Sequence, residues 1–391
     1  MIMENEYEFT ELIPSLPEEL ALECLTRLHY SVHMVASQVC KKWNFLLKSK
    51  EFYYHRKQTG HTQIAACFIQ ALPTSSDGKP IGQPSYGVSI FDSVSQNWDR
   101  VDSVPKYPNG LPLFCQISSS EGKLILMGGW NPSSWEPVKD VFVYEFTTRR
   151  WTQCVDMPSK RSFFAMAAFE GRVYIAGGHD ENKNALDSAW VFDIEKNEWT
   201  ELTRMSEERD ECQGLVIDDE FWVVSGYDTD NQGRFKSSAE VLGLRNFTSS
   251  SLVPLKERHN RITKLSPLIH PNERHNEIIK SSTLVPLKKR HNLQWRRVDD
   301  AWNASQCPRS RVGKGKNGNL LCYTEFNSAV QVSACGVDLG GQTLVTGSAY
   351  QGAPHGFYIV DKSDGQNGKL KKIDVPDEFS GIIQSGCCVD I

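Results

Sequence analysis

The sequence has no long apolar run and no excess of positive charge. No stretch approaches the roughly 18 apolar residues that a membrane-spanning helix needs, and a net charge of −5 argues against nucleic acid as the main partner. The eleven cysteines lack metal-ligand spacing, so we expect them to be mostly reduced and buried. The acidic start, with Glu4, Glu6 and Glu8, is not typical of a signal or transit peptide. These absences favour a chain of the cytoplasm or nucleus that does not enter a membrane.

One pattern recurs through the middle of the chain: an apolar run, a glycine pair and, later, two aromatic residues seven positions apart. Trp151 and Trp199 close successive copies and are 48 residues apart. The apolar runs with their glycines are Leu124–Gly129, Val173–Gly178 and Phe221–Gly226. Self-similarity near a period of 50 is typical of kelch-type blades, each a four-stranded sheet. We therefore predict an all-β propeller over residues 62–391.

Aromatic pairs within the repeat predict a hairpin in each blade. The pairs share the seven-residue offset and are Phe91 with Trp98, Tyr144 with Trp151, and Phe192 with Trp199. Their rings are expected to fill the space between neighbouring blades. The glycine pairs are expected to allow positive φ and close approach of the backbone.

Counting the blades depends on apolar runs that we predict to be inner strands near the axis. These runs are 63–70, 124–129, 173–178, 221–226, 319–323 and 343–347. The last two are about half a period apart, which favours six blades with one abbreviated and leaves five as the alternative. The strand-like tail ending at Ile391 is expected to supply the missing first strand of the blade that begins at Gln63 and so to close the ring.

The segment between Leu244 and Leu293 breaks the blade rhythm. Its Arg-His-Asn triplets recur every 16 residues, at positions 258, 274 and 290, and Trp199 and Trp295 are twice the usual interval apart. We predict an insertion over residues 246–293 in the outer hairpin of the fourth blade, and its low hydrophobicity favours disorder. Its equally spaced histidines, His259, His275 and His291, lack the closer ligands of a zinc site, so no metal or cofactor is predicted.

The N-terminal segment, residues 10–57, has helical periodicity. Ser15 and Glu18 have the spacing of a capping box, and Pro17 suits a first helical turn. Apolar residues at intervals of three and four follow, including Leu20, Leu25 and Leu28. A module of this size is marginal on its own, so we expect it to bury apolar surface against a partner.

Two runs in this segment, Leu16-Pro17-Glu18-Glu19-Leu20 and Val39-Cys40-Lys41-Lys42-Trp43, resemble the F-box. The resemblance implies docking on the Skp-type adaptor of a cullin-RING ubiquitin ligase. The positions that it implies for the adaptor interface or its supporting core are Leu16, Pro17, Leu20, Val39, Cys40 and Trp43.

The chain apart from its insertion resembles plant F-box/kelch-repeat proteins. Two tail segments, 352–357 and 385–389, are similar to the subgroup that binds phenylalanine ammonia-lyase. The resemblance implies a non-catalytic substrate receptor that directs this enzyme to ubiquitination and lowers phenylpropanoid synthesis. Some members of the subgroup are linked to type-B response regulators, which are a second implied target.

The target-binding surface is predicted from blade-equivalent positions. Arg161 and Arg209 each follow a blade tryptophan by ten residues, and Arg309 or Arg311 is the candidate after Trp295. Such arginines can bind carboxylates, or can bridge blades internally. Aromatic and polar residues just after the apolar runs are expected to be exposed on the same surface: Trp130, Trp135, His179 and Tyr227.

Two other classes of protein remain open. A propeller enzyme would need clustered metal ligands or paired carboxylates at a consistent blade position, and the sequence shows neither. A cytoskeletal or signalling kelch scaffold without ligase activity would not need the F-box-like segment.

Overall fold

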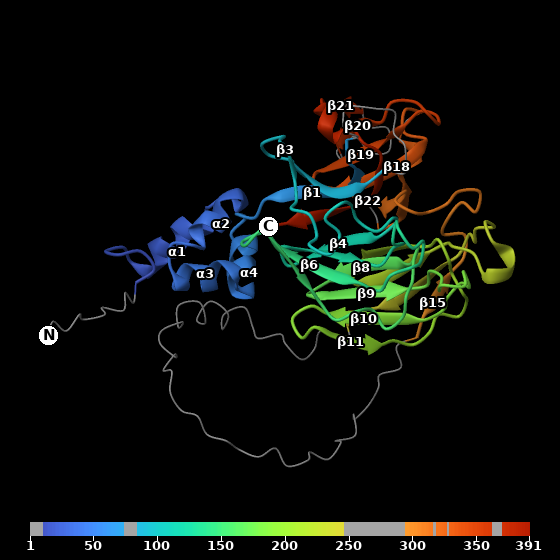
Figure 1. Ribbon diagram of the computed structural model, residues 1–391, viewed down its shortest axis with the longest axis horizontal. Helices are drawn as coiled ribbons and strands as arrows, with labels where there is room; N and C mark the ends of the chain where they lie inside the picture. The colour runs from blue at the N-terminus through green and yellow to red at the C-terminus, as the bar shows by residue number, and fades with distance from the viewer. Residues whose placement is uncertain (1–10, 74–83, 246–293, 316–317, 327, 362–369) are drawn as a thin grey trace, which may run out of the picture.

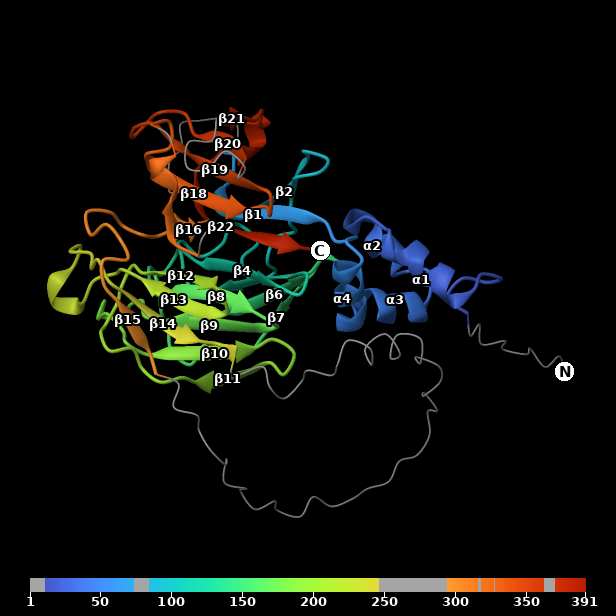
Figure 2. The ribbon, with the colours of Figure 1, turned by 180° about the vertical axis from the view of Figure 1, so that it is seen from behind.

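The computed structural model describes residues 11–73, 84–245, 294–315, 318–326, 328–361 and 370–391. A lobe of short helices lies beside a larger body made of β-sheets, and the C-terminus lies where the two meet (Figure 1). The view from behind shows the same arrangement (Figure 2). Among the described residues no helix has both the length and the apolar character to cross a bilayer.

The helical lobe has four α-helices and a short 3₁₀ turn: α1 (Glu18–Thr26), η1 (Tyr30–Val32), α2 (His33–Ala36), α3 (Lys41–Lys48) and α4 (Lys50–Gln58). Its core contains Leu22, Leu25, Leu46, Leu47 and Phe52, all at most 7% exposed. The predicted capping box does not form. Pro17 is the N-cap residue, and the Glu18 carboxylate instead accepts the Leu12 N–H at 3.2 Å and pairs with Lys42 at 3.0 Å.

Three four-stranded antiparallel sheets begin the propeller. The first is ordered β22 (Ile383–Asp390), β1 (Ile64–Ala71), β2 (Tyr86–Asp92), β3 (Trp98–Arg100). The second is β4 (Gln116–Ser120), β5 (Lys123–Met127), β6 (Val141–Glu145), β7 (Arg150–Gln153). The third is β8 (Ala165–Phe169), β9 (Arg172–Ala176), β10 (Ala189–Asp193), β11 (Glu198–Glu201).

Three further sheets complete the ring. The fourth is β12 (Gln213–Ile217), β13 (Glu220–Val224), β14 (Ala239–Gly243), β15 (Arg296–Val298). A two-stranded sheet follows, β16 (Val312–Lys314) with β17 (Leu320–Cys322). The last is β18 (Val332–Asp338), β19 (Gln342–Ser348), β20 (Gly356–Asp361), β21 (Lys371–Lys372). In the described connections lie three short 3₁₀ turns: η2 (Thr229–Asn231), η4 (Tyr323–Glu325) and η6 (Asp377–Phe379).

The propeller thus has five complete blades, the number that the sequence left open as the alternative. The short sheet β16–β17 occupies the position of the abbreviated unit, because β16 contacts both β12 and β18. Tyr323 fills space beside this short sheet. A Cβ atom added at Gly313 would lie 2.1 Å from the Tyr323 hydroxyl oxygen, and one added at Gly336 would lie 2.3 Å from the Tyr323 ring. Both glycines therefore make room for that side chain.

The apolar runs predicted to be inner strands are instead the second strands of their sheets. The strands that contact one another around the axis are β22, β4, β8, β12, β16 and β18. The reason is physical: a second strand is covered on both faces and reads as a continuous apolar run, as in β5, whose Leu124–Met127 are at most 1% exposed. The innermost strand β4 is more polar, with Gln116 and three serines.

The C-terminal strand closes the ring, as predicted. β22 pairs antiparallel with β1, from Ile64 opposite Asp390 to Gln70 opposite Ile383. The backbones of Gln63 and Ile391 then exchange two hydrogen bonds of 2.9 Å. The first blade therefore combines the two ends of the propeller sequence, and β1 is paired on both sides.

The aromatic pairs are cross-strand neighbours, as their spacing predicted. Tyr144 lies opposite Trp151 and Phe192 lies opposite Trp199, with ring centroids 5.0 Å apart in both pairs. The tryptophans also bond to the preceding blade: the indole N–H of Trp151 donates to the Asp102 carbonyl at 2.6 Å. In the same way the indole N–H of Trp199 donates to the Val155 carbonyl, and that of Trp295 donates to the Thr203 carbonyl.

The glycine pairs lie where backbones of one blade approach each other. Gly129 has φ of 94°, and a Cβ atom there would lie 2.6 Å from the Leu113 carbonyl oxygen. Gly178 has φ of 81°, and a Cβ there would lie 2.4 Å from the Ser162 carbonyl oxygen. The glycines are therefore required by this packing, as the sequence predicted.

Helix α4 fixes the lobe to one end of the propeller. Tyr54 donates to the Glu121 carboxylate at 2.7 Å, and Lys57 pairs with Asp390 at 3.3 Å. Arg56, 2% exposed, donates to the carbonyls of Thr26 (3.1 Å), Leu28 (3.0 Å) and His61 (2.8 Å) and to the Gln63 side chain (2.9 Å). Because these contacts span the linker at residues 59–63, lobe and propeller are held in one orientation.

The predicted insertion lies between β14 and β15, the outer two strands of the fourth blade. These strands pair from Ala239 opposite Val298 to Val241 opposite Arg296. The strands that flank residues 246–293 are therefore those of the outer hairpin. Residues 246–293 themselves, with the three histidines, lie outside the described residues, and the insertion stays a prediction.

Candidate functional site

The residues predicted for adaptor binding divide into an exposed group and a supporting group. Pro17, Val39 and Cys40 are exposed, and Leu20 is 54% exposed although the periodicity put it on the apolar stripe. Leu16 is half-buried. Trp43 is also half-buried and supports the lobe, because its indole N–H donates to the Leu12 carbonyl at 2.6 Å. Cys40 is the N-cap of α3, and its Sγ accepts the Trp43 N–H at 3.4 Å.

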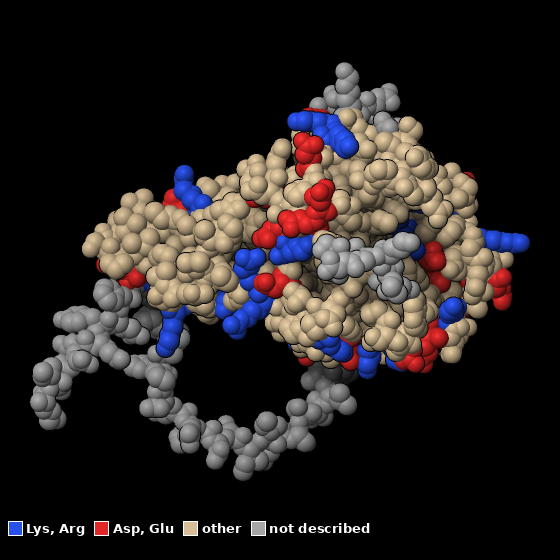
Figure 3. Space-filling view, turned by 45° about the horizontal axis from the view of Figure 1, so that its top comes forward, with Lys and Arg blue, Asp and Glu red and all other residues tan. Residues whose placement is uncertain are grey.

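Exposed apolar side chains are concentrated in this lobe. Among the described residues, ten large apolar side chains are exposed, and five of them lie between residues 20 and 45: Leu20, Val32, Val35, Val39 and Phe45. The end of the lobe far from the propeller is largely free of charged side chains in Figure 3. We define these five residues as the apolar face of the lobe. A concentration of this kind is typical of a protein-binding surface.

Sequence reasoning missed Val32, Val35 and Phe45 as members of the apolar face. The available signal was apolar residues in excess of what a 45-residue helical module can bury. Helix α3 shows this directly: Leu46 and Leu47 enter the core at 4% and 5% exposure, whereas the adjacent Phe45 is 65% exposed.

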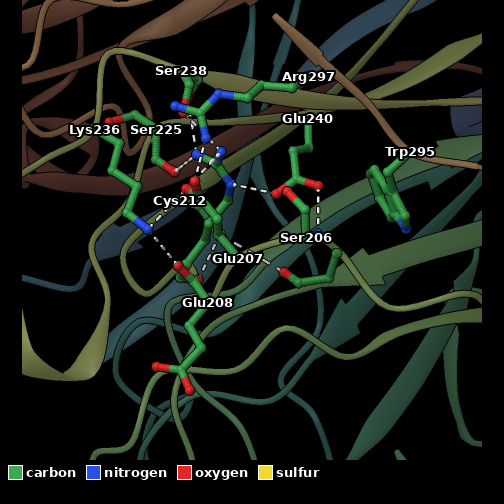
Figure 4. Close-up of polar contacts among 12 residues, drawn as sticks. Ser206, Glu207, Glu208, Cys212, Ser225, Lys236, Ser238, Glu240, Trp295 and Arg297 are labelled. Atoms are coloured by element: carbon green, nitrogen blue, oxygen red, sulfur yellow. Dashed lines mark hydrogen bonds and ion pairs between the residues drawn. The ribbon is translucent and has the colours of Figure 1, made fainter. Parts of the chain in front are cut away.

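The prediction that Arg161 and Arg209 bind a target is wrong, because both side chains are completely buried. Arg209 donates to the Ser225 and Ser238 carbonyls at 2.9 Å and 3.0 Å and pairs with Glu240 at 3.2 Å. Figure 4 shows Glu240 and the two serines around this site. Arg161 likewise bonds to the Gly177 carbonyl at 3.2 Å. Both arginines are therefore internal, but they satisfy backbone carbonyls of their own blade rather than bridging two blades, as the alternative prediction had it.

The propeller end opposite the helical lobe carries a ring of unusual backbone positions. Phe114, Phe163, Glu211 and Ser310 each lie two residues before an innermost strand, and their φ values are 57°, 54°, 50° and 61°. Non-glycine residues in this left-handed region cost of order 1–3 kcal/mol each and cluster at binding sites. We call these four residues, with Arg309, the distal mouth.

Arg309 is the predicted arginine that reaches this surface. Its guanidinium lies over the Phe163 ring, 4.1 Å from the centroid, and 5.4 Å from the Phe114 centroid. Its Nε lies 3.5 Å from the Glu211 carboxylate, and the side chain is 28% exposed. Arginine stacked on aromatic rings is a common anchor at protein interfaces.

The other predicted target-binding residues lie around the distal mouth with different exposure. His179 is 4% exposed; its Nδ1–H donates to Asp210 at 2.9 Å, and its ring contacts those of Phe163 and Trp130, with centroids 5.2 Å and 5.7 Å away. His179 is therefore too buried to contact a partner directly and supports the aromatic rings beside it. Trp130 is half-buried, whereas Trp135 is 50% exposed.

Tyr227 borders the acidic side of the mouth. Burial, followed by the nearby carboxylate of Asp210, raises the pKa of Tyr227, so its phenol stays protonated at neutral pH. The hydroxyl donates to Glu211 at 3.3 Å. Glu211 thus accepts from Tyr227 while it pairs with Arg309, and this holds the two side chains at the mouth.

No cluster of three or more histidine, cysteine or acidic side chains within the described ranges is arranged to hold a metal ion. All eleven cysteines are free thiols. Burial raises the pKa of Cys115 and Cys212, the latter to about 12, so these thiols are protonated and serve as small apolar side chains.

Fold and surfaces together define a β-propeller joined to an F-box lobe. An F-box domain model matches residues 13–55, and the KLHDC2/KLHL20/DRC7 Kelch-repeats domain model matches residues 77–253. The Arabidopsis thaliana F-box/kelch-repeat protein At1g15670 is 33% identical over 390 residues, which cover 97% of this chain and 100% of that protein. The chain therefore belongs to the plant F-box/kelch-repeat proteins.

Two further Arabidopsis thaliana relatives match part of the chain. F-box/kelch-repeat protein At2g44130 is 39% identical over 257 residues, 59% of this chain and 62% of its own length. F-box/kelch-repeat protein At1g80440 is 40% identical over 233 residues, 59% of this chain and 66% of its own length. The matches to these two relatives thus span less than two thirds of their length.

Proposed function

We propose that this protein is the substrate-recognition subunit of a Skp-cullin-F-box ubiquitin ligase, acting in the cytoplasm or nucleus. The apolar face of the lobe carries this proposal. Leu20, Val35, Val39 and Phe45 expose 54% to 65% of their surface, and their burial against a Skp-type adaptor would be favourable at about 25 cal/mol per Å² of apolar area. No residue of the chain needs to take part in bond making.

The mechanism is positioning. Helix α4 fixes the lobe against one end of the propeller through Arg56, Tyr54 and Lys57, and the distal mouth lies at the other end. A target held at the distal mouth is kept near the ubiquitin-loaded enzyme, so that the effective concentration of its lysines is raised.

Phenylalanine ammonia-lyase is the first target that we propose, and type-B response regulators are the second. The support is the similarity of residues 352–357 and 385–389 to the corresponding subgroup. In the structure these residues have internal roles: Ser385 to Val389 belong to the closing strand β22, and His355 bonds to Thr346 at 2.6 Å. They therefore support membership of a subgroup rather than direct contact with a target.

Adaptor binding separates this proposal from a kelch scaffold without ligase activity and from a propeller enzyme. Purified full-length chain carrying Val39→Glu is expected to lose capture by an immobilised Skp-type adaptor, because a buried unpaired carboxylate opposes docking. Val94→Glu is the matched control, since Val94 is 75% exposed on the propeller. Equal capture of the two variants, or no capture of the unchanged chain, would refute the proposal.

A further inference from the structure

We propose that the distal mouth and the groove beside it bind an extended segment of the target that carries an acidic residue followed or preceded by apolar side chains. This inference rests on the proposed function, because it describes what the receptor recognises. Its two halves are the Arg309 guanidinium, which selects a carboxylate, and a groove of mixed polar and apolar lining that includes the neighbour of Phe114, Leu113.

Arg309 has unused hydrogen-bonding capacity at an accessible position. A guanidinium has five N–H donors, and among the described residues its polar partners are the Glu211 carboxylate at 3.5 Å and the neighbouring Cys307 thiol. Arg209, the buried arginine of the preceding unit, instead bonds to two carbonyls, a serine hydroxyl and a carboxylate. The difference marks Arg309 as the arginine that is available to a ligand.

The aromatic rings under Arg309 prepare it for that role. Phe163 and Phe114 hold the guanidinium plane at 4.1 Å and 5.4 Å, and their own rings lie 4.8 Å apart. Both phenylalanines have positive φ, which other packing must stabilise. A guanidinium fixed in this way loses little side-chain entropy when it binds a carboxylate bidentately.

The Glu211 carboxylate pairs with Arg309 and would compete with a target carboxylate for its guanidinium. This carboxylate pairs with Arg309 at 3.5 Å, accepts from the Tyr227 hydroxyl at 3.3 Å and accepts from the Cys307 thiol at 3.5 Å. A target carboxylate would replace this long ion pair by shorter, bidentate hydrogen bonds. Removal of the Glu211 charge is therefore expected to strengthen binding of an acidic segment, an effect opposite in sign to loss of Arg309.

A groove of about 550 Å³ is lined mainly by the segments before β4 and after β5. Its lining combines apolar side chains, including Leu111, Pro132 and Trp135, with polar ones, including Lys106, Asn109 and Asn131. Leu113 connects the two halves, because it lines the groove and directly precedes Phe114. Trp135 supplies an exposed indole at the groove, with half of its surface accessible. The occupant that fits both halves is a peptide segment with a carboxylate and adjacent apolar side chains.

The test uses a phage-displayed library of random twelve-residue peptides, selected on full-length protein bound to its adaptor or alone. We expect sequences enriched in Asp or Glu beside an aromatic or aliphatic residue. For a selected peptide, Arg309→Ala should weaken binding at least about tenfold, the loss of a charge-assisted hydrogen bond. Glu211→Gln should tighten binding about threefold, and Trp135→Ala should reduce the apolar preference while the acidic preference remains.

Arg296→Ala is the matched control, because Arg296 is a half-exposed arginine on the outer strand β15 that pairs with Glu220 at 3.0 Å. Selection without acidic enrichment, or equal loss of peptide binding in the Arg309 and Arg296 variants, would overturn the inference. Weaker binding of the peptide by Glu211→Gln would also overturn it. Capture of the same protein preparations by the immobilised adaptor tests the proposed function separately, because it does not depend on Arg309.

Discussion

Arg209 and Glu240 form an ion pair of 3.2 Å in which both side chains are at most 1% exposed. The pair joins the loop before β12 to strand β14 of the same blade, and Glu240 also accepts the Ser206 N–H at 2.8 Å. Its position explains why an arginine recurs ten residues after a blade tryptophan: the side chain donates to buried carbonyls of its own blade, which for Arg209 are those of Ser225 and Ser238.

Replacing Arg209 is therefore expected to destabilise the fold. Arg209→Met leaves the Glu240 charge buried without its ion-pair partner and the Ser225 carbonyl without its donor, and loss of one member of such a pair costs about 3–5 kcal/mol. Chemical denaturation of the full chain measures this change. Arg204→Ala, which breaks an exposed pair with Asp187 at 2.8 Å, should cost at most about 1 kcal/mol. Similar stability of the two variants would contradict the assignment.

Deletion of residues 380–391 is expected to prevent correct folding. The deletion removes β22, exposes the edge of β1 and uncovers Phe68, which is completely buried. Soluble yield and the thermal transition measure the effect. A synthetic peptide of residues 380–391 added during refolding should restore part of the soluble yield. Unchanged thermal stability of the truncated chain would rule out closure by this strand.

The tryptophan contacts between blades predict a graded loss of stability. Trp151→Phe keeps an aromatic ring beside Tyr144 but removes the 2.6 Å hydrogen bond to Asp102, at a cost of about 1 kcal/mol. Trp199→Phe removes a longer bond of 3.3 Å to Val155 and should cost less. Urea midpoints compare the two, and a larger loss for Trp199→Phe would contradict the proposed order.

Acid is expected to weaken the helical lobe through His33. Burial lowers the pKa of His33 from 6.5 to about 4. As the pH falls below about 6.5, His33 takes up a proton in the unfolded chain, whereas in the folded chain it does so only near pH 4. The contribution of His33 to stability is therefore fully present above pH 6.5 and is lost as the pH falls from 6.5 to 4. His33→Gln should reduce the difference in unfolding free energy between pH 7 and pH 5.

His355 provides the internal comparison for that measurement. Burial also lowers the pKa of His355 to about 4, so the His33 variant should keep the part of the acid sensitivity that comes from the propeller. A pH dependence identical to that of the unchanged chain would show that His33 does not titrate as described.

Much of the propeller could be predicted because its strands repeat a local chemical requirement. The seven-residue offset correctly paired Phe91 with Trp98, since a short hairpin leaves few registers. The order of strands in a blade was misjudged for a physical reason: the most apolar strand is second from the axis, and polar β4 borders the channel.

The site was harder to predict because burial depends on the direction of a loop. Arg161 and Arg209 lie ten residues after a blade tryptophan and two before a positive-φ residue, and both turn into the propeller. Arg309 lies fourteen residues after Trp295 and directly before Ser310, and it reaches the mouth. Phe114, Phe163 and Glu211 were missed although their spacings of 49 and 48 residues follow the repeat. All three residues have a positive φ. A glycine in the sequence indicates that such a φ is possible, whereas phenylalanine and glutamate give no such indication.

Hydrogen exchange of the full-length chain with and without a saturating Skp-type adaptor tests the central claim most directly. The account predicts slower exchange of backbone amides confined to residues 16–45 of the lobe, with unchanged exchange around Phe114, Phe163 and Arg309. Slower exchange at the distal mouth, or no change in residues 16–45, would contradict a receptor whose two ends bind different partners.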